Sequence, residues 1–357
     1  MSRIASASRV DLPALSEQMT AMSKWSRSVS LVGVGVAALA WMCWQFGLDE
    51  LITTLGQVSA TGLLVYLLLS VAVVVAHSIR WQLVTRALGE RVPLSRLVGA
   101  RLAGDAVGAL VPSAKLAGEP VRVALVCADG VAGTEAGAGV SIDRLLEVIS
   151  NMLCFVLYVS IFSLTRVDSA RSAPAVIAVM VALLAALAVP LLMLRRGMAP
   201  LAPLYGERAQ RWLRPLAPWM PALRGTEAHL LTFFRDHAGT FMVGLVAALG
   251  TEALVVGQYW MLLSAFAITL DLPTLLLALV GTGFARSLPT PAGLGALEAS
   301  QVSVLALAAG RPDIGFVVGV VMRLHETLWI LVGLAVLFAR GTWLVRRRTR
   351  IAGKVAA

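Results

Sequence analysis

Long apolar runs alternate with short polar segments along most of this sequence. The runs predict membrane-crossing helices over residues 29–46, 61–83, 138–164, 173–194, 239–267 and 314–338. Each is about twenty residues or longer, the length that an α-helix needs to cross roughly 30 Å of hydrocarbon. Membrane β-strands would instead be about ten residues long with alternating polarity. The pattern predicts an all-α polytopic membrane protein with about six transmembrane helices.

Two further stretches, residues 93–128 and 272–309, are apolar but interrupted. The interruptions that we expect to break the helices are Pro112, Gly118, Pro289, Pro291, Gly293 and Gly295. Proline removes an amide donor and glycine loosens the backbone, so polar groups are left needing partners. Such backbone is tolerated at membrane depth only where it is buried in protein or lines a wet cavity. Each stretch is therefore predicted to form a re-entrant hairpin.

Basic residues predict the orientation. With six crossings, every arginine-rich segment falls on one side, including the one formed by Arg80, Arg86, Arg91, Arg96 and Arg101. By the positive-inside rule, both termini of this multi-pass protein are then cytoplasmic. The expected organisation is a cytoplasmic segment 1–28, a first membrane half 29–194, a basic connector 195–236 lying on the membrane surface, a second half 237–339 and a basic tail 340–357.

Composition supports the membrane assignment and narrows the chemistry. The chain is 58% hydrophobic and 14% charged, against roughly 25% charged residues in soluble domains. Basic cytoplasmic segments account for the net charge of +10, so we expect no nucleic-acid partner. Scattered histidines and cysteines without CxxC spacing predict no metal site, disulfide or cofactor. The sequence also lacks the GxSxG, HExxH, P-loop and Rossmann motifs of common enzymes.

Three landmarks occur twice along the chain. They are Trp81 and Trp260, the breaks at Pro112 and Pro289, and the Arg-Leu-x-Glu motifs at 144–147 and 323–326. Three crossings separate the two sets, so the second copy is predicted to be upside down. Inverted repeats with broken segments at matching positions are typical of transporters built around a site near the bilayer midplane.

Ionisable residues in the apolar segments are the candidate functional residues, because they are costly there and usually face a cavity or each other. They are Asp105, Lys115, Glu119, Arg122, Asp143, Arg144 and Glu147 in the first half, and Glu252, Arg286, Glu298, Arg323, His325 and Glu326 in the second. The i,i+3 spacing lets Arg144 pair with Glu147, and Arg323 with Glu326. These pairs are either structural clasps or donors shared with a lipid phosphate, which arginine binds with two hydrogen bonds.

The glutamates allow both structural and functional roles. Glu119 and Glu298 lie beside the breaks and can accept hydrogen bonds from exposed amides there. Glu252 has no charged counterpart in the first half, so it is either a neutral hydrogen-bonding residue or a proton-coupling carboxylate with Arg286 as its partner. We expect a packing or hydrogen-bonding role for His325.

The sequence also resembles a known family. The stretch 288–298, LPTPAGLGALE, together with Leu110-Val111-Pro112 and Gly118-Glu119-Pro120-Val121-Arg122, is similar to the flippase-like membrane domain of bacterial lysylphosphatidylglycerol synthases. The resemblance covers roughly residues 30–340 and implies a location in the bacterial inner membrane. It implies lipid translocation, and we expect no lipid-modifying chemistry because the tail after residue 340 is too short for the soluble aminoacyl-transferase domain of the synthases.

Together these features predict a protein that moves a lipid or lipid-linked molecule between leaflets by alternating access. Arg122, Arg144, Arg286 and Arg323 would bind an anionic head group, so the expected partner is a membrane lipid. One alternative is an intramembrane enzyme that modifies a lipid head group, with Glu252, Glu298 and Glu326 as acid or base. The other is an accessory scaffold for a lipid-biosynthetic enzyme.

Overall fold

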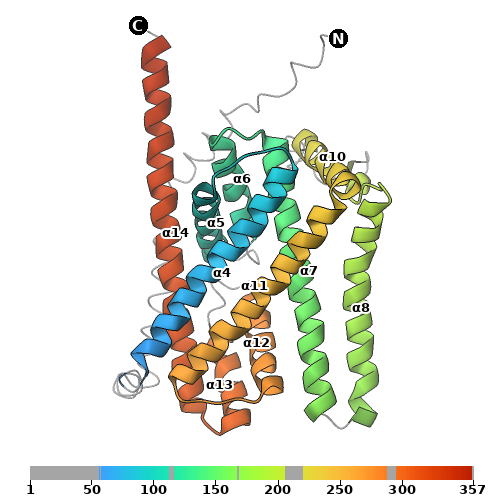
Figure 1. The fold of residues 1–357 in the computed structure, drawn as a ribbon, viewed down its shortest axis with the longest axis vertical. Coiled ribbons are helices and arrows are strands. Elements are labelled where there is room, and N and C mark those ends of the chain that lie inside the picture. Colours follow the sequence, from blue (N-terminus) through green and yellow to red (C-terminus); the bar gives the residue numbers. More distant parts are fainter. Residues whose placement is uncertain are drawn as a thin grey trace. The chain divides into compact units, whose positions relative to one another are not determined.

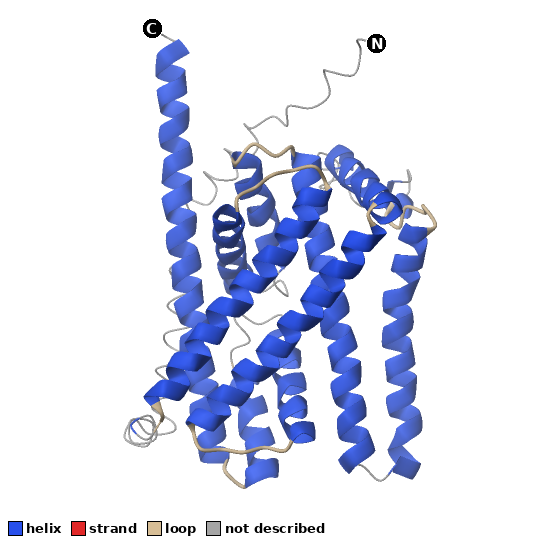
Figure 2. Cartoon of the chain, viewed as in Figure 1, coloured by secondary structure: helices blue, strands red, loops and turns tan. Residues whose placement is uncertain are grey.

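The computed structural model describes residues 56, 58–111, 116–166, 169–205, 220–287 and 295–355. The expected N-terminal segment 1–28 and first span 29–46 lie outside the described residues. All regular structure in the described part is helical (Figure 2).

Five helices in the described part are long and apolar enough to cross a membrane. They are α4 (Ala60–Ala87), α7 (Gly133–Arg166), α8 (Ser169–Arg195), α11 (Ala238–Ala265) and α14 (Pro312–Val355). Their outward leucines and valines are exposed, for example Leu68 at 59% and Val246 at 70%. Apolar surface of this extent is typical of helices that face lipid. The chain is therefore an all-α polytopic membrane protein, as the hydrophobic pattern predicted.

The long helices alternate in direction. In Figure 1, α4, α8 and α14 run one way, and α7 and α11 run the other. Along its length α4 packs against α11. Ser59 begins α4 because its hydroxyl accepts a hydrogen bond from the Gly62 amide at 3.2 Å, satisfying one of the unpaired donors of the first turn.

Each of the two interrupted stretches contains a pair of short helices. The first holds α5 (Leu94–Leu110), the 3-10 turn η1 (Leu116–Gly118) and α6 (Glu119–Ala128). The second holds α12 (Leu272–Ser287) and α13 (Ala296–Ala309). The two pairs lie at opposite ends of the long helices (Figure 1).

Helix α14 packs against both short pairs. A Cβ atom on Gly333 would overlap the carbonyl oxygen of Leu102 on α5. Nearer its start, a Cβ atom on Gly315 would lie 2.7 Å from the carbonyl oxygen of Gln301 on α13. Glycine thus allows backbone contact with one helix of each pair.

The described part of the connector between α8 and α11 contains the turn η2 (Ala202–Tyr205) and helix α10 (Met220–Asp236). Phe233 and Phe234 of α10 are buried against α7 and α8. The buried Glu227 accepts a hydrogen bond from the Leu201 amide at 2.7 Å. These contacts hold the connector against the membrane helices.

Candidate functional site

Asp143 on α7 is the centre of a buried cluster of charges. Its carboxylate is fully buried and accepts hydrogen bonds from Arg80 on α4, Arg101 on α5 and Arg122 on α6. The distances are 2.9 Å from Arg80 Nε, 3.2 Å from Arg101 Nη1 and 2.6 Å from Arg122 Nη2. A single carboxylate therefore connects four helices through charge-assisted hydrogen bonds.

Two glutamates extend this network. Glu147 lies 2.9 Å from both Arg101 Nη2 and Arg144 Nη1. At the start of α6, Glu119 accepts from Arg122 Nη1 at 3.0 Å and lies 3.9 Å from Arg144 Nε. We call this network the first charged cluster; its members are Arg80, Arg101, Asp105, Glu119, Arg122, Asp143, Arg144 and Glu147. The four arginines balance the four carboxylates, so the attraction between them offsets the cost of removing these charges from water.

Close backbone packing positions Arg122 in this cluster. A Cβ atom on Gly118 would overlap the carbonyl oxygen of Gly104, so α5 and the start of α6 touch through backbone. The Arg122 guanidinium lies over the Trp81 ring, with its Cζ 4.1 Å from the ring centroid. Trp81 thus adds a cation–π contact to the ion pairs that hold Arg122.

A smaller network, the second charged cluster, joins α12, α13 and α14. Arg323 on α14 donates to Glu298 on α13 at 2.9 Å and to Glu326 at 3.0 Å. Glu326 also accepts from Arg286 on α12 at 2.9 Å. Arg323 and Glu298 are buried, whereas Arg286 is 31% exposed. The four residues tie both short helices to α14.

A neutral network lies beside the second cluster. Gln301 on α13 is fully buried and donates to the Thr282 hydroxyl of α12 at 2.9 Å. Its amide oxygen accepts a hydrogen bond from the Tyr259 hydroxyl of α11. This network links α11, α12 and α13 without charge.

The structure brings most of the candidate residues into these networks. Both i,i+3 arginine–glutamate pairs close, and each of their arginines also reaches a glutamate on a short helix. Glu298 accepts from the Gly295 amide at 2.9 Å, as expected for a carboxylate beside a break. Glu119 instead faces Arg122 and Arg144. Gly295 and Gly118 precede α13 and α6, whereas Pro112, Lys115, Pro289, Pro291 and Gly293 lie outside the described residues.

The expected pairing of Glu252 with Arg286 is wrong. Arg286 pairs with Glu326. Glu252 is partly buried on α11, and within the described residues it forms no ion pair. Sequence position placed both residues in the second half, but it did not give the helix faces on which they lie.

Two central residues of the first charged cluster were not predicted from the sequence. Arg80 and Arg101 were counted among the arginines that mark a cytoplasmic end, but Arg80 is fully buried and Arg101 is 4% exposed. The available indication was that Arg80 lies inside an apolar run, where an arginine needs a buried partner. His325 packs on the Tyr66 ring and accepts from the Trp329 indole at 3.0 Å, in agreement with a packing and hydrogen-bonding role.

Comparison with known proteins gives a family match over almost the whole chain. Residues 28–349 match the family described as the lysylphosphatidylglycerol synthase TM region. A "UPF0104 membrane protein" of Methanothermobacter thermautotrophicus is 31% identical over 130 residues, which is 36% of this chain and 38% of that relative. No solved structure matches the chain.

Proposed function

Since the chain belongs to the lysylphosphatidylglycerol synthase transmembrane-region family, we propose that it moves a lipid or lipid-linked molecule between the leaflets of its membrane. The substrate carries an anionic head group. The membrane is the bacterial inner membrane, with both termini on the cytoplasmic side. The proposal rests on the family and on the two charged clusters, and the following features support it.

Two helix sets of similar build support an inverted repeat. The first set is α4–α7 and the second is α11–α14. Corresponding helices begin at Ala60 and Ala238, Leu94 and Leu272, Glu119 and Ala296, and Gly133 and Pro312, a nearly constant spacing. The opposite directions of α4 and α11 (Figure 1) agree with a second set that is inverted relative to the first. This arrangement is typical of transporters with alternating access.

The observation that carries the proposal is a triad that recurs in both sets. Glu119, Arg144 and Glu147 in the first set have the same spacing as Glu298, Arg323 and Glu326 in the second. Each arginine lies between a glutamate on a short helix and a glutamate on its own helix. Each set therefore presents an arginine next to a break in the backbone, where a phosphate could replace a carboxylate.

Partial exposure suggests where an anionic head group would enter. Arg144 is 25% exposed and Arg286 is 31% exposed, so part of each guanidinium is accessible. The fork of donors on arginine fits two phosphate oxygens. In this mechanism Arg144 and Arg286 bind the head group first, and the more buried Arg122 and Arg323 hold the short helices that act as gates.

The helix sets also differ, which suits a transporter that must distinguish two sides. At the position corresponding to Asp143 the second set has Met322, and at the position of Arg122 it has Gln301. The carboxylate and an arginine that binds it are thus both replaced by uncharged residues. The first pair of short helices is held by more ion pairs than the second.

Reconstitution into liposomes tests the proposal. The purified protein should move a fluorescent anionic phospholipid between leaflets, and Arg144→Gln with Arg286→Gln should lower the rate by about tenfold, as expected for the loss of charge-assisted contacts. Arg195→Gln, which changes an exposed arginine at the end of α8, serves as the control. Recovery of a chemically altered lipid would favour the enzyme alternative, and the absence of both transport and modification would contradict the proposal.

A further inference from the structure

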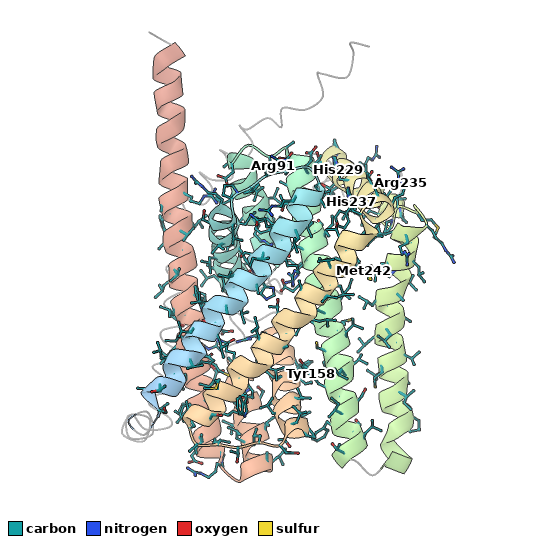
Figure 3. The ribbon with its side chains drawn as sticks, in the orientation of Figure 1. Arg91, Tyr158, His229, Arg235, His237 and Met242 are labelled. Carbon is teal, nitrogen blue, oxygen red and sulfur yellow. The ribbon has the colours of Figure 1, made fainter. Side chains whose placement is uncertain are left out.

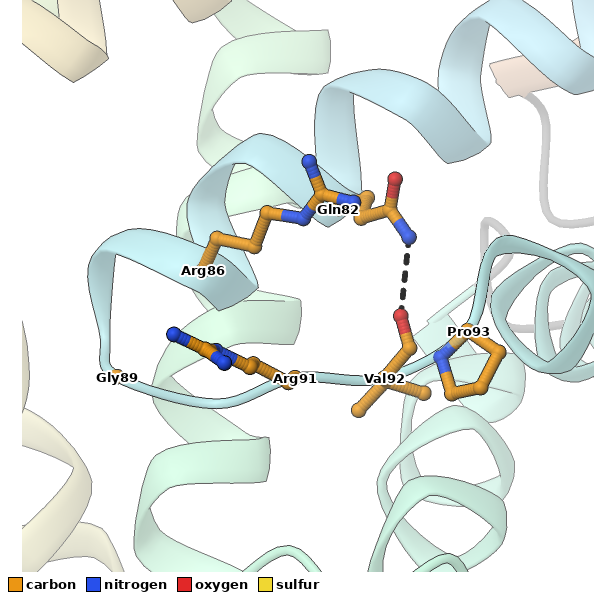
Figure 4. Close-up of a pocket in the computed structure, with 6 residues that line it drawn as sticks. All are labelled: Gln82, Arg86, Gly89, Arg91, Val92 and Pro93. Carbon is orange, nitrogen blue, oxygen red and sulfur yellow. Dashed lines mark hydrogen bonds between the residues drawn. The ribbon is translucent and has the colours of Figure 1, made fainter.

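A pocket of about 670 Å³ opens where α4 leads into α5 (Figure 4). It is lined by Gln82, Arg86, Gly89, Arg91, Val92 and Pro93. None of the residues of the two charged clusters lines it. The pocket is widely open to its surroundings.

Two exposed arginines give this pocket its charge. The side chains of Arg86 and Arg91 form no hydrogen bond or ion pair within the described part of the chain, and Glu90 between them pairs with neither. In the first charged cluster, by contrast, every arginine has a carboxylate partner. Two guanidinium groups at one pocket without carboxylate partners can donate to an added anion.

The backbone that carries these arginines is fixed by hydrogen bonds. Gln82 Nε2 donates to the Val92 carbonyl at 2.9 Å, closing one side of the pocket (Figure 4). Gly89 has φ +88°, a value that favours glycine, and its amide donates to the Arg86 carbonyl at 3.0 Å. Because this backbone is already ordered, a ligand loses less free energy to ordering the site when it binds.

The pocket lies at the end of a candidate membrane span. The apolar helix α4 ends at Ala87, within the pocket-lining stretch. Arg91 lies at the same end of the long helices as His229 and Arg235 (Figure 3). Lipid head groups meet the protein where apolar spans end, and arginine binds their phosphates through paired donors.

We propose that this pocket binds the phosphate of a membrane-lipid head group, with Arg86 and Arg91 donating to the phosphate oxygens. Val92 and Pro93 lie at the side where the pocket joins α5. The site is separate from the arginines of the transport proposal. Binding here should therefore persist when Arg144 and Arg286 are changed.

Lipid titration of the detergent-solubilised protein tests this site. Dioctanoyl phosphatidylglycerol is the probe, and dioctanoylglycerol, which has the same chains without phosphate, is the comparison. In a protein that already carries Arg144→Gln and Arg286→Gln, so that the transport arginines do not bind the probe, Arg86→Gln with Arg91→Gln should weaken binding of the probe by about tenfold or more, as expected when two charge-assisted donors are lost. Arg195→Gln with Arg196→Gln makes the same change in net charge at the end of α8 and should leave binding within about twofold.

A second variant separates pocket shape from charge. Gln82→Leu keeps both arginines but removes the hydrogen bond to Val92, so binding should fall although the net charge is unchanged. If the double arginine variant does not fold, Arg91→Gln alone replaces it, because Arg91 is exposed in the loop.

Four results would overturn the assignment. The first two are that the Arg86/Arg91 variant binds the probe as well as the parent does, or that it loses no more affinity than the Arg195/Arg196 control. The third is that dioctanoylglycerol binds as tightly as the probe. The fourth is that inorganic phosphate, at the probe's own concentration, displaces the probe completely. The last result would identify the ligand as free phosphate instead of a lipid.

Discussion

Arg122 Nη2 lies 2.6 Å from Asp143 Oδ2, and both side chains are buried within helices made largely of apolar residues. Two further arginines share the same carboxylate. Removing one member of such a group leaves buried charge that the remaining members no longer balance, whereas the complete group is balanced. The first two predictions follow from this balance.

Asp143→Asn should destabilise the protein strongly, because three buried arginines lose their shared negative charge. The expected loss in the free energy of unfolding is about 3–5 kcal/mol, the usual cost of breaking a buried ion pair. Denaturant unfolding in detergent micelles measures it. Asp105→Asn is the matched control, since Asp105 is 53% exposed and lies 3.5 Å from Arg101; it should cost at most about 1 kcal/mol. Equal stabilities of the two variants would contradict the prediction.

Replacing Asp143 and Arg122 together by the residues of the second helix set should destabilise the protein less than the sum of the two single replacements. The double change Asp143→Met with Arg122→Gln introduces the residues found at Met322 and Gln301. It removes an acid and a base together, so the two single costs should not add. We expect a favourable coupling of about 0.5–3 kcal/mol in a double-mutant cycle. Strict additivity would mean that the two residues contribute independently.

Arg323→Ala should lower stability more than Arg144→Ala. The Arg323 side chain is 4% exposed, whereas that of Arg144 is 25% exposed. Removing Arg323 leaves Glu298 and Glu326 without their shared donor. The loss for Arg323→Ala should be about 3–5 kcal/mol. Glu326→Ala should also destabilise, because it removes the carboxylate partner of Arg286 and one of the two carboxylate partners of Arg323. If Arg323→Ala and Glu326→Ala are as stable as the parent but inactive in transport, the pair serves the substrate and not the fold.

Glu252→Gln should fold and bind lipid but lose any pH dependence of transport. Glutamine keeps the shape and hydrogen bonding of a protonated glutamate and cannot ionise. Transport is measured in liposomes at several pH values, with and without a proton gradient. Asp236→Asn is the control, because this carboxylate lies at the end of α10 and pairs with the exposed Arg235. A Glu252→Gln protein with the full pH profile of the parent would leave this residue as a hydrogen-bonding group only.

Single cysteines should report the orientation of the chain. Cysteines in place of Asp49 and Asp271 should react with an impermeant thiol reagent added outside the cell, and tags at both termini should be accessible only from the cytoplasm. Asp271 lies in the connection between α11 and α12. Termini on opposite faces would rule out the six-span arrangement.

The helices themselves were largely predictable from sequence. The runs 61–83, 138–164, 239–267 and 314–338 each lie within or within two residues of an observed long helix, because lipid forces the backbone to satisfy its own hydrogen bonds wherever the side chains are apolar. The i,i+3 pairs were equally accessible, since helix geometry fixes which neighbours meet.

The partners of the charged residues were less predictable. Arg80 and Arg101 lie 63 and 42 residues from Asp143 in the sequence, and no local pattern specifies that they meet. The positive-inside rule treats every arginine near a helix end alike, although some are buried. Glu252 was assigned the wrong partner because its helix face depends on how α11 packs, which a hydrophobic pattern around the whole helix does not reveal.

The backbone contacts of α14 have a mechanical consequence. Gly333 touches α5 of one short pair and Gly315 touches α13 of the other. Between these two glycines α14 is a continuous helix without proline, and such a helix resists bending. Both short pairs therefore pack on one uninterrupted helix. If one pair is displaced, either α14 moves with it and displaces the other pair, or the displaced pair slides along the backbone that the glycine exposes.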